Sequence, residues 1–75
     1  MLEQIKEMIM NYVDVEAEMI TADARFIEDL HFNSYDFMSF LGEVEETFDI
    51  IVEEEDVLNI RTVGEAVAYI ENLKA

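Results

Sequence analysis

A chain of 75 residues has room for one hydrophobic core, so we expect a single domain over residues 1–75. Nineteen Asp and Glu against four Lys and Arg give a net charge of −15, which disfavours binding to nucleic acid and to anionic membrane surfaces. The same charge favours protein partners with basic patches, and repulsion between copies makes a monomer the simplest expectation.

The chain contains no cysteine, which rules out disulfides and fits a reducing compartment. No apolar run reaches the roughly 18 residues of a membrane span. The first ten residues, MLEQIKEMIM, have neither the basic segment nor the cleavage site of a signal peptide. We therefore expect a soluble, cytoplasmic protein.

The first expected helix carries apolar residues at helical spacing, namely Leu2, Ile5, Ile9, Tyr12 and Val13. Residues 14–33 show no clean helical period. A connection of that length is uncommon without order of its own, so we expect a crossover that is anchored by its apolar side chains: Val15, Ile20, Phe26, Ile27 and Leu30.

Helical spacing returns at Ser34, with an apolar stripe formed by Phe37, Leu41, Val44 and Phe48. Either Asn33 or Ser34 suits the cap of this second helix, because both side chains accept hydrogen bonds from first-turn amides. Gly42 falls in the middle of the helix, where glycine costs about 1 kcal/mol relative to alanine.

Residues 48–52 are apolar and β-branched, but no second strand-like run could pair with them, so we expect a buried connection. Residues 54–59 suit a short helix with Val57 and Leu58 turned inward. Thr62 and Glu65 form a capping box, which predicts a last helix with the apolar stripe Val63, Ala66, Val67, Ile70 and Leu73. The expected fold class is all-α, a small helical bundle of three main helices plus one short helix.

An enzymatic function finds little support among the residues. The sequence lacks a cysteine nucleophile, a glycine-rich phosphate loop and a spaced Cys/His ligand set. The single histidine, His31, lies three residues before Ser34, a spacing that says nothing about a catalytic triad. The acidic run 53–56 lacks the alternating ligands and glycine of a calcium loop, so we expect no metal site.

Four segments resemble the acyl carrier protein family, in order and over nearly the whole chain: residues 26–30 (FIEDL), 33–36 (NSYD), 44–50 (VEETFDI) and 60–70 (IRTVGEAVAYI). The resemblance implies that Ser34 carries a covalent 4'-phosphopantetheine arm, transferred from coenzyme A by a phosphopantetheinyl transferase. It implies a carrier that is not an enzyme and holds acyl groups as thioesters for fatty-acid, polyketide or related biosynthesis. A helix N-terminus suits the phosphodiester.

The resemblance also implies a docking surface on the second helix for basic patches of the transferase, acyl-loading enzymes and synthases. The matching positions are Asn33, Tyr35, Asp36, Glu45 and Glu46, with Glu54 on the short helix. In the family, the space between the second and third helices opens to shelter the acyl chain. Candidates for lining it are Phe26, Phe37, Leu41, Val44, Phe48 and Ile60, which by periodicity are first of all core residues.

The chain departs from the family pattern around the serine. Asn33 replaces the usual Asp, Tyr35 replaces the usual Leu, and Ser39 and Gly42 stand where an acid and a large apolar residue are more common. These differences suggest a specialised carrier with its own partners. Two alternatives remain: an aminoacyl carrier of the D-alanyl or peptidyl kind, and an acidic interaction module whose serine is never modified.

Overall fold

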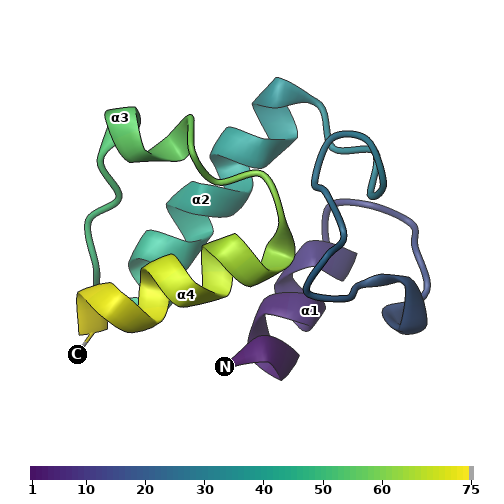
Figure 1. Cartoon of the computed structure of the whole chain (residues 1–75), viewed down its shortest axis with the longest axis horizontal. Helices are drawn as coiled ribbons and strands as arrows, with labels where there is room; N and C mark the ends of the chain where they lie inside the picture. Colours follow the sequence, from purple (N-terminus) through teal and green to yellow (C-terminus); the bar gives the residue numbers. More distant parts are fainter. Residues whose placement is uncertain (75) are drawn as a thin grey trace.

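The computed structural model describes residues 1–74, and those residues form helices and loops with no strand. The expected all-α bundle of three main helices and one short helix is confirmed (Figure 1). The elements are α1 (Leu2–Met10), the 3₁₀ turn η1 (Ala17–Met19), α2 (Ser34–Phe48), α3 (Glu54–Val57) and α4 (Val63–Lys74).

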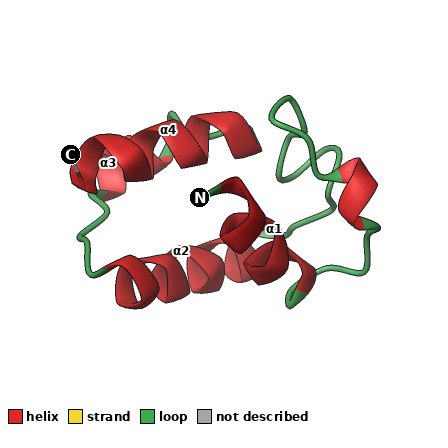
Figure 2. Ribbon diagram, turned by 90° about the horizontal axis from the view of Figure 1, so that it is seen from below, coloured by secondary structure: helices red, strands yellow, loops and turns green. Residues whose placement is uncertain are grey.

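The helices enclose one core. Figure 2 shows α2 and α4 on opposite sides of the molecule, and α1 completes the bundle. The long connection from α1 to α2 lies at one end of the molecule and α3 at the other (Figures 1 and 2). The start of α2 is therefore at the end that the crossover forms.

Each long helix buries residues spaced three or four apart, as an amphipathic helix does. The buried residues are Ile5, Met8 and Ile9 on α1, Phe37, Phe40, Leu41, Val44 and Phe48 on α2, and Val63, Ala66 and Ile70 on α4. The stripe expected on α2 is confirmed. Sequence reasoning missed Phe40, which is fully buried.

The crossover is ordered, as expected, and it is anchored by Ile20, Phe26 and Leu30, which are buried. Val15 packs against the core from a half-buried position. The expectation for Ile27 is wrong, since 48% of its surface is exposed. Ile27 follows Phe26 within a turn, and the turn that directs the phenyl ring inward leaves the next side chain outside.

The end of the first helix differs from the expected one. α1 ends at Met10, so Tyr12 and Val13 pack against the core from the following loop rather than from the helix. α2 ends at Phe48 and is capped by Asp49, which adopts the left-handed conformation (φ 56°) and donates its backbone N–H to the carbonyl of Glu45. A left-handed residue there closes the helix in the way that glycine often does.

The connection from α2 to α4 is more exposed than expected. The expectation of a buried connection over residues 48–52 is wrong for Ile51, which is 75% exposed, and Leu58 is 77% exposed instead of turned inward. α3 has only four residues, and none of them is buried. Val57 packs against the core from a half-buried position. Leu73, in the last turn of α4, is also exposed, contrary to the stripe expected for that helix.

The capping box at the start of α4 is confirmed. The backbone N–H of Glu65 donates to Oγ1 of Thr62 (3.2 Å), and the backbone N–H of Thr62 donates to Oε1 of Glu65 (2.9 Å). Oε1 of Glu65 also accepts the backbone N–H of Arg61 (3.0 Å), and the backbone hydrogen bonds from Arg61 and Thr62 hold the pKa of Glu65 below its ordinary value. The capping box thereby satisfies the amides of Thr62 and Glu65 at the start of α4.

Candidate functional site

Ser34 is the first residue of α2, and its side chain is exposed. The cap of the helix is Asn33, whose Oδ1 accepts the backbone N–H of Asp36 at 2.7 Å. Sequence reasoning left the cap open between the two residues, and the structure assigns it to Asn33. Because the Asn33 side chain takes the capping role, the Ser34 hydroxyl is not needed for it and forms no hydrogen bond within residues 1–74.

The first turn of α2 is suited to an anionic group. The N–H groups of a helix's first turn have no intrahelical partners. Here Asp36 and Phe37 donate to the side chain and carbonyl of Asn33, whereas the N–H groups of Ser34 and Tyr35 have no protein acceptor within the described chain. A phosphodiester on the Ser34 oxygen would lie beside these free donors, at the positive end of the helix dipole. The residues present therefore fit 4'-phosphopantetheine.

The loop that leads to Ser34 is closed by its own backbone. Phe32 donates its N–H to the carbonyl of Phe26 at 2.9 Å, and Leu30 donates to the carbonyl of Arg25 at 3.0 Å. His31 sits between them in the left-handed conformation (φ 64°), which is uncommon for a residue with a side chain. The loop therefore has a defined shape just before the helix begins.

Arg25 and Asp29 clamp the base of this loop. Oδ2 of Asp29 accepts hydrogen bonds from Nε of Arg25 (2.9 Å) and from its backbone N–H (2.8 Å), and Oδ1 accepts one from Nη2 (3.2 Å). The hydrogen bonds from the Arg25 side chain, and to a smaller extent the one from its backbone N–H, lower the pKa of Asp29 from its ordinary 3.8 to about 2. The Asp29 carboxylate is therefore ionised at neutral pH, when it holds the loop closed.

The same loop is tied to α4. Phe26 donates its N–H to the carbonyl of Arg61 (3.0 Å), and Val63 donates to the carbonyl of Ala24 (2.9 Å). Gly64 donates to the carbonyl of Ala22 at 2.8 Å. A Cβ on Gly64 would lie 2.9 Å from that carbonyl oxygen, a distance too short for normal contact. The close approach therefore requires glycine at position 64.

A cluster of five aromatic rings lies beneath the start of α2: Tyr12, Phe26, Phe32, Phe37 and Phe40. The ring centroids of Phe26 and Phe37 are 5.0 Å apart, and those of Phe26 and Phe32 are 5.5 Å apart. Separations of this size are typical of attractive aromatic pairs. Because Phe32 precedes Ser34 and Phe37 follows it, the cluster fixes the chain on both sides of the hydroxyl.

The candidate docking residues lie on α2 and its cap, except for Glu54 on α3. Tyr35 is 79% exposed, and Asn33, Glu46 and Glu54 are also exposed. Asp36 and Glu45 are half-buried. Oε2 of Glu45 accepts the backbone N–H of Val52 at 2.9 Å, so this carboxylate also supports the turn after α2.

The six candidates for lining an acyl cavity, Phe26, Phe37, Leu41, Val44, Phe48 and Ile60, are all buried in the common core. Ile60 also lines a surface groove between α3 and α4, together with Asp56, Asn59, Glu65, Ala68, Tyr69 and Asn72. Their part in sheltering an acyl chain stays a prediction.

Tyr69 connects α3 to α4, a role that sequence reasoning missed. Its hydroxyl donates to Oδ2 of Asp56 at 2.8 Å and accepts the backbone N–H of Glu53 at 3.3 Å. The pKa of Tyr69 is raised, mainly by partial burial and to a smaller extent by the hydrogen bond to Asp56. A tyrosine on an otherwise apolar face is the signal that could have indicated a polar partner.

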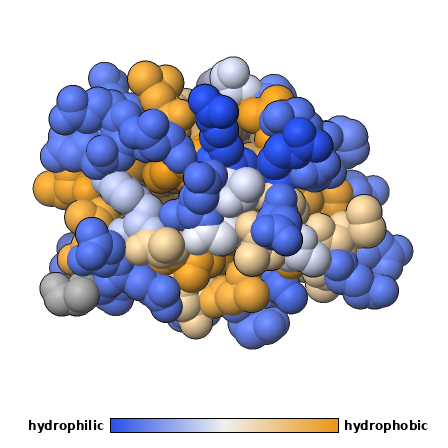
Figure 3. Space-filling view, in the orientation of Figure 1, coloured by the Kyte–Doolittle hydropathy of each residue, from blue (hydrophilic) through white to orange (hydrophobic). Residues whose placement is uncertain are grey.

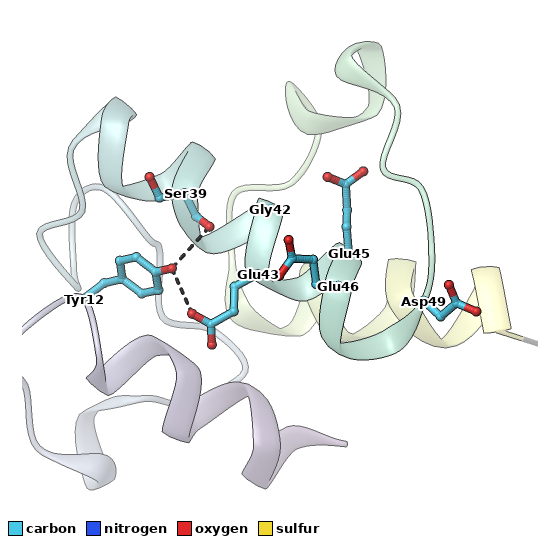
Figure 4. Close-up of a pocket in the computed structure, with 7 residues that line it drawn as sticks. All are labelled: Tyr12, Ser39, Gly42, Glu43, Glu45, Glu46 and Asp49. Atoms are coloured by element: carbon cyan, nitrogen blue, oxygen red, sulfur yellow. Dashed lines mark hydrogen bonds between the residues drawn. The ribbon is translucent and has the colours of Figure 1, made fainter.

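A second groove follows the outer side of α2 (Figure 4), lined by Tyr12, Ser39, Gly42, Glu43, Glu45, Glu46 and Asp49. The Tyr12 hydroxyl donates to Oε1 of Glu43 (2.9 Å) and also lies 3.2 Å from the carbonyl oxygen of Ser39. The pKa of Tyr12 is raised, mainly by partial burial and to a smaller extent by the hydrogen bond to Glu43. Sequence reasoning singled out Gly42 without finding a reason for it.

Within residues 1–74, no three His, Cys, Asp or Glu side chains are placed to hold a metal ion together. No helix in that part of the chain is long and apolar enough to cross a membrane.

Comparisons with known proteins give a consistent result. A family model described as a phosphopantetheine attachment site matches residues 3–70. An acyl carrier protein from Akkermansia muciniphila is 39% identical over 72 residues, which are 96% of this chain and 90% of the relative. The solved structure of the acyl carrier protein from Enterococcus faecalis superposes with a TM-score of 0.84 at 35% identity, over 96% of this chain and 91% of the other.

Proposed function

The chain belongs to the acyl carrier protein family, and on that premise we propose that Ser34 is the residue to which its phosphopantetheine arm is attached. Members of this family are carriers rather than enzymes, with covalently bound 4'-phosphopantetheine, and they interact with a phosphopantetheinyl transferase and with biosynthetic enzymes. The arm supplies a thiol for thioester chemistry, which explains how a chain without cysteine performs this function.

The observation that carries the proposal is the exposed hydroxyl of Ser34 at the start of α2, left free because Asn33 caps the helix. The residue requires no base of its own, because it is the substrate of another enzyme. Neighbouring N–H groups without protein partners support a phosphate at this position.

The acidic outer surface supports docking onto basic patches of partner enzymes. No Lys or Arg occurs between Arg25 and Arg61, and the candidate contacts Asp36, Glu46 and Glu54 lie within this span. Hydrophilic residues cover much of the face seen in Figure 3, with separate apolar patches between them. Such a surface steers association with basic proteins.

We further propose that the arm carries acyl groups for fatty-acid, polyketide or a related biosynthesis in the cytoplasm, and that the protein acts as a monomer. The strong negative charge supports an acyl rather than an aminoacyl carrier. The absence of cysteine supports a reducing compartment.

Mass spectrometry tests the attachment site. The chain has two serines, Ser34 and Ser39, both exposed on α2, so the second provides a matched control. Incubation with coenzyme A and a broad-specificity transferase should add the mass of phosphopantetheine to the wild type and to Ser39→Ala, but not to Ser34→Ala. Modification of Ser34→Ala would refute the assignment, and failure of the wild type with every transferase of the organism would favour an unmodified interaction module.

Loading of the modified protein then identifies the cargo. Acyl-activating and aminoacyl-activating ligases are each supplied with the modified protein, and thioester formation is measured by mass. Transfer of fatty or related acyl groups supports the proposal, whereas exclusive transfer of an amino acid would make the chain an aminoacyl carrier.

A further inference from the structure

Four phenylalanine rings fill the part of the core beneath Ser34. Two come from the crossover and two from the first two turns of α2: Phe26, Phe32, Phe37 and Phe40. All six pairs among these rings have centroids between 5.0 and 6.4 Å apart, so each ring contacts the other three. The four side chains are between 0% and 9% exposed. The rings therefore pack as one unit, the four-ring cluster.

The four-ring cluster is held in place by its neighbours. The ring of Tyr12 packs against Phe32 and Phe40, with centroids 6.2 and 6.1 Å apart. The Tyr12 hydroxyl donates to Glu43, which fixes this ring against α2 (Figure 4). The backbone N–H of Phe32 donates to the carbonyl of Phe26, so the two crossover rings are fixed relative to each other. Because a close-packed interior has few voids, room for another apolar chain here requires several rings to move together.

Phe37 is the ring of the cluster that lies nearest to the attachment site on the helix. It follows Ser34 by three residues, and side chains three apart are neighbours on a helix surface. Phe37 is 9% exposed, more than the other three rings. An acyl chain that entered the core directly from an arm on Ser34 would meet this ring first. Phe37 therefore blocks that path.

The far end of α2 is covered in a different way. Phe48 lies eleven residues after Phe37, about 16 Å along the helix axis. Nζ of Lys74 lies 5.8 Å from the centroid of the Phe48 ring and donates to the Phe48 carbonyl at 3.3 Å. Phe48 is 7% exposed, which is close to the value for Phe37, but it takes no part in the four-ring cluster. Phe48 is therefore a matched position for a control.

We propose that the four-ring cluster excludes acyl chains of octanoyl size or longer from the core, that the cargo is a short acyl group such as acetyl, and that Phe37 is the specificity-determining residue. Admission of an octanoyl chain would separate several ring pairs and overpack the core beneath Ser34. Exposure of such a chain to water is unfavourable in proportion to its apolar area, so a carrier without shelter suits short cargo. This inference rests on the proposed function and specifies its substrate class.

Thermal unfolding of the loaded protein provides the first test. A broad-specificity transferase attaches the loaded arm from acetyl-coenzyme A or from octanoyl-coenzyme A. An acyl chain that binds only to the folded core raises the melting temperature. The two wild-type forms should melt within about 2 °C of each other, whereas Phe37→Leu, which leaves space beside Ser34, should melt at least about 4 °C higher with octanoyl than with acetyl.

Phe48→Leu is the matched control, because it makes the same substitution on the same helix at similar exposure but outside the four-ring cluster. Its two loaded forms should melt within about 2 °C of each other, as in the wild type. Each variant is compared with its own acetyl form, so a loss of stability that both forms share cancels. The wild-type pair decides the inference even where a variant is too unstable to be loaded.

Nuclear magnetic resonance provides a second test that needs no arm. The ¹⁵N-labelled, unloaded wild type is titrated with the acetyl and octanoyl thioesters of N-acetylcysteamine, which mimic the loaded end of the arm. The amides of Phe37 and Phe40 should shift no more with the octanoyl compound than with the acetyl compound.

Two results would overturn the exclusion of long chains: a wild-type octanoyl form that melts at least about 4 °C above the acetyl form, or larger shifts of the Phe37 and Phe40 amides with the octanoyl thioester. The role of Phe37 would be overturned by Phe37→Leu without the octanoyl gain, or by an equal gain in Phe48→Leu. Failure of the proposed function is a separate outcome, in which the wild type gains no arm and the titration alone decides the inference.

Discussion

The conformation around Ser34 depends on a small number of residues that lie outside α2. Asp29 closes the preceding loop by accepting three hydrogen bonds from Arg25, and His31 turns the chain through the left-handed region. Asn33 then caps the helix in place of the serine. Each of these residues acts on the hydroxyl by positioning the backbone rather than by touching it.

The low pKa of Asp29 predicts a dependence of stability on pH. Because its folded pKa, about 2, is below its ordinary 3.8, Asp29 stabilises the fold fully above about pH 4, and this contribution is lost as the pH falls through about 2. Asp29→Asn should therefore lower the melting temperature at pH 7, and the difference from the wild type should shrink steadily as the pH falls from about 4 through about 2.

Thermal unfolding followed by circular dichroism at a series of pH values measures this difference. Glu28→Gln is the control, because Glu28 pairs with Arg25 at 3.5 Å on an exposed surface without bonding to the backbone. An equal effect of the two substitutions at every pH would contradict the prediction.

The left-handed backbone of His31 predicts an unusual order of substitutions. Valine is β-branched and strongly disfavoured at positive φ, so His31→Val should lower the free energy of unfolding by about 1–2 kcal/mol. His31→Gly should cost less, although glycine is more flexible in the unfolded chain, because glycine adopts this conformation without strain. Urea unfolding of both variants measures the order, and a more stable valine variant would refute it.

The helices depend on contacts between elements as well as on their own sequences. α4 begins at its capping box, but two amides of its first turn also donate hydrogen bonds to the crossover, at the carbonyls of Ala22 and Ala24. α3 has only four residues, too few to be stable alone, and Tyr69 of α4 holds it. Lys74, in the last turn of α4, donates to the carbonyl of Phe48 at 3.3 Å and so supports the end of α2.

The two glycines should respond in opposite ways to alanine. Gly42→Ala should stabilise the fold by about 1 kcal/mol, because the added methyl meets no atom and alanine favours helix. Gly64→Ala should destabilise it by about 1–3 kcal/mol, because the methyl would press on the Ala22 carbonyl oxygen that Gly64 approaches. Chemical denaturation measures both, and the same sign for the two variants would show that their surroundings are not as described.

Removing the Tyr69 hydroxyl should loosen α3 selectively. Tyr69→Phe leaves the ring in place but removes the bonds to Asp56 and Glu53, which should cost about 1 kcal/mol. The amides of Asp56 and Val57, which donate to the Glu53 carbonyl, should then exchange faster with solvent deuterium.

The control for this prediction is Tyr12→Phe, which removes the hydrogen bond between the segment after α1 and α2. It should leave the exchange of the α3 amides unchanged. Faster exchange at α3 in both variants would indicate a general loss of stability instead of a local one.

For the whole molecule, repulsion between like charges is the dominant electrostatic feature. The net charge is −15, and the described residues contain only three ion pairs, all at the surface and two of them made by Arg25. Exposed pairs contribute little to stability. Salt therefore weakens more repulsion than attraction in this protein.

The melting temperature should consequently rise with ionic strength. Raising sodium chloride from about 0.01 M to about 1 M shortens the screening length from about 30 Å to about 3 Å. We expect an increase of at least about 4 °C, which corresponds to about 1 kcal/mol for a domain of this size. Differential scanning calorimetry measures it, and a constant or falling melting temperature would contradict the prediction.

Features that depend on neighbours in the sequence were predictable from it. The capping box of α4, the start of α2 beside Ser34, the apolar stripe of α2 and the helical fold class follow from spacing and from side-chain chemistry within one or two turns. The net charge is likewise a property of composition alone. The resemblance to a family predicted Ser34 as the attachment site, and the exposure of its side chain is seen only in the structure.

The remaining features arise only when distant segments meet. Apolar character does not reveal that Phe40 is buried while Ile51 and Leu58 are exposed, because burial depends on which element covers each side chain. The need for glycine at position 64 comes from the backbone of Ala22, more than forty positions earlier in the chain. Sequence determines what each segment can form, and the tertiary contacts decide which of its side chains the core accepts, since burial and hydrogen bonding require partners from elsewhere in the chain.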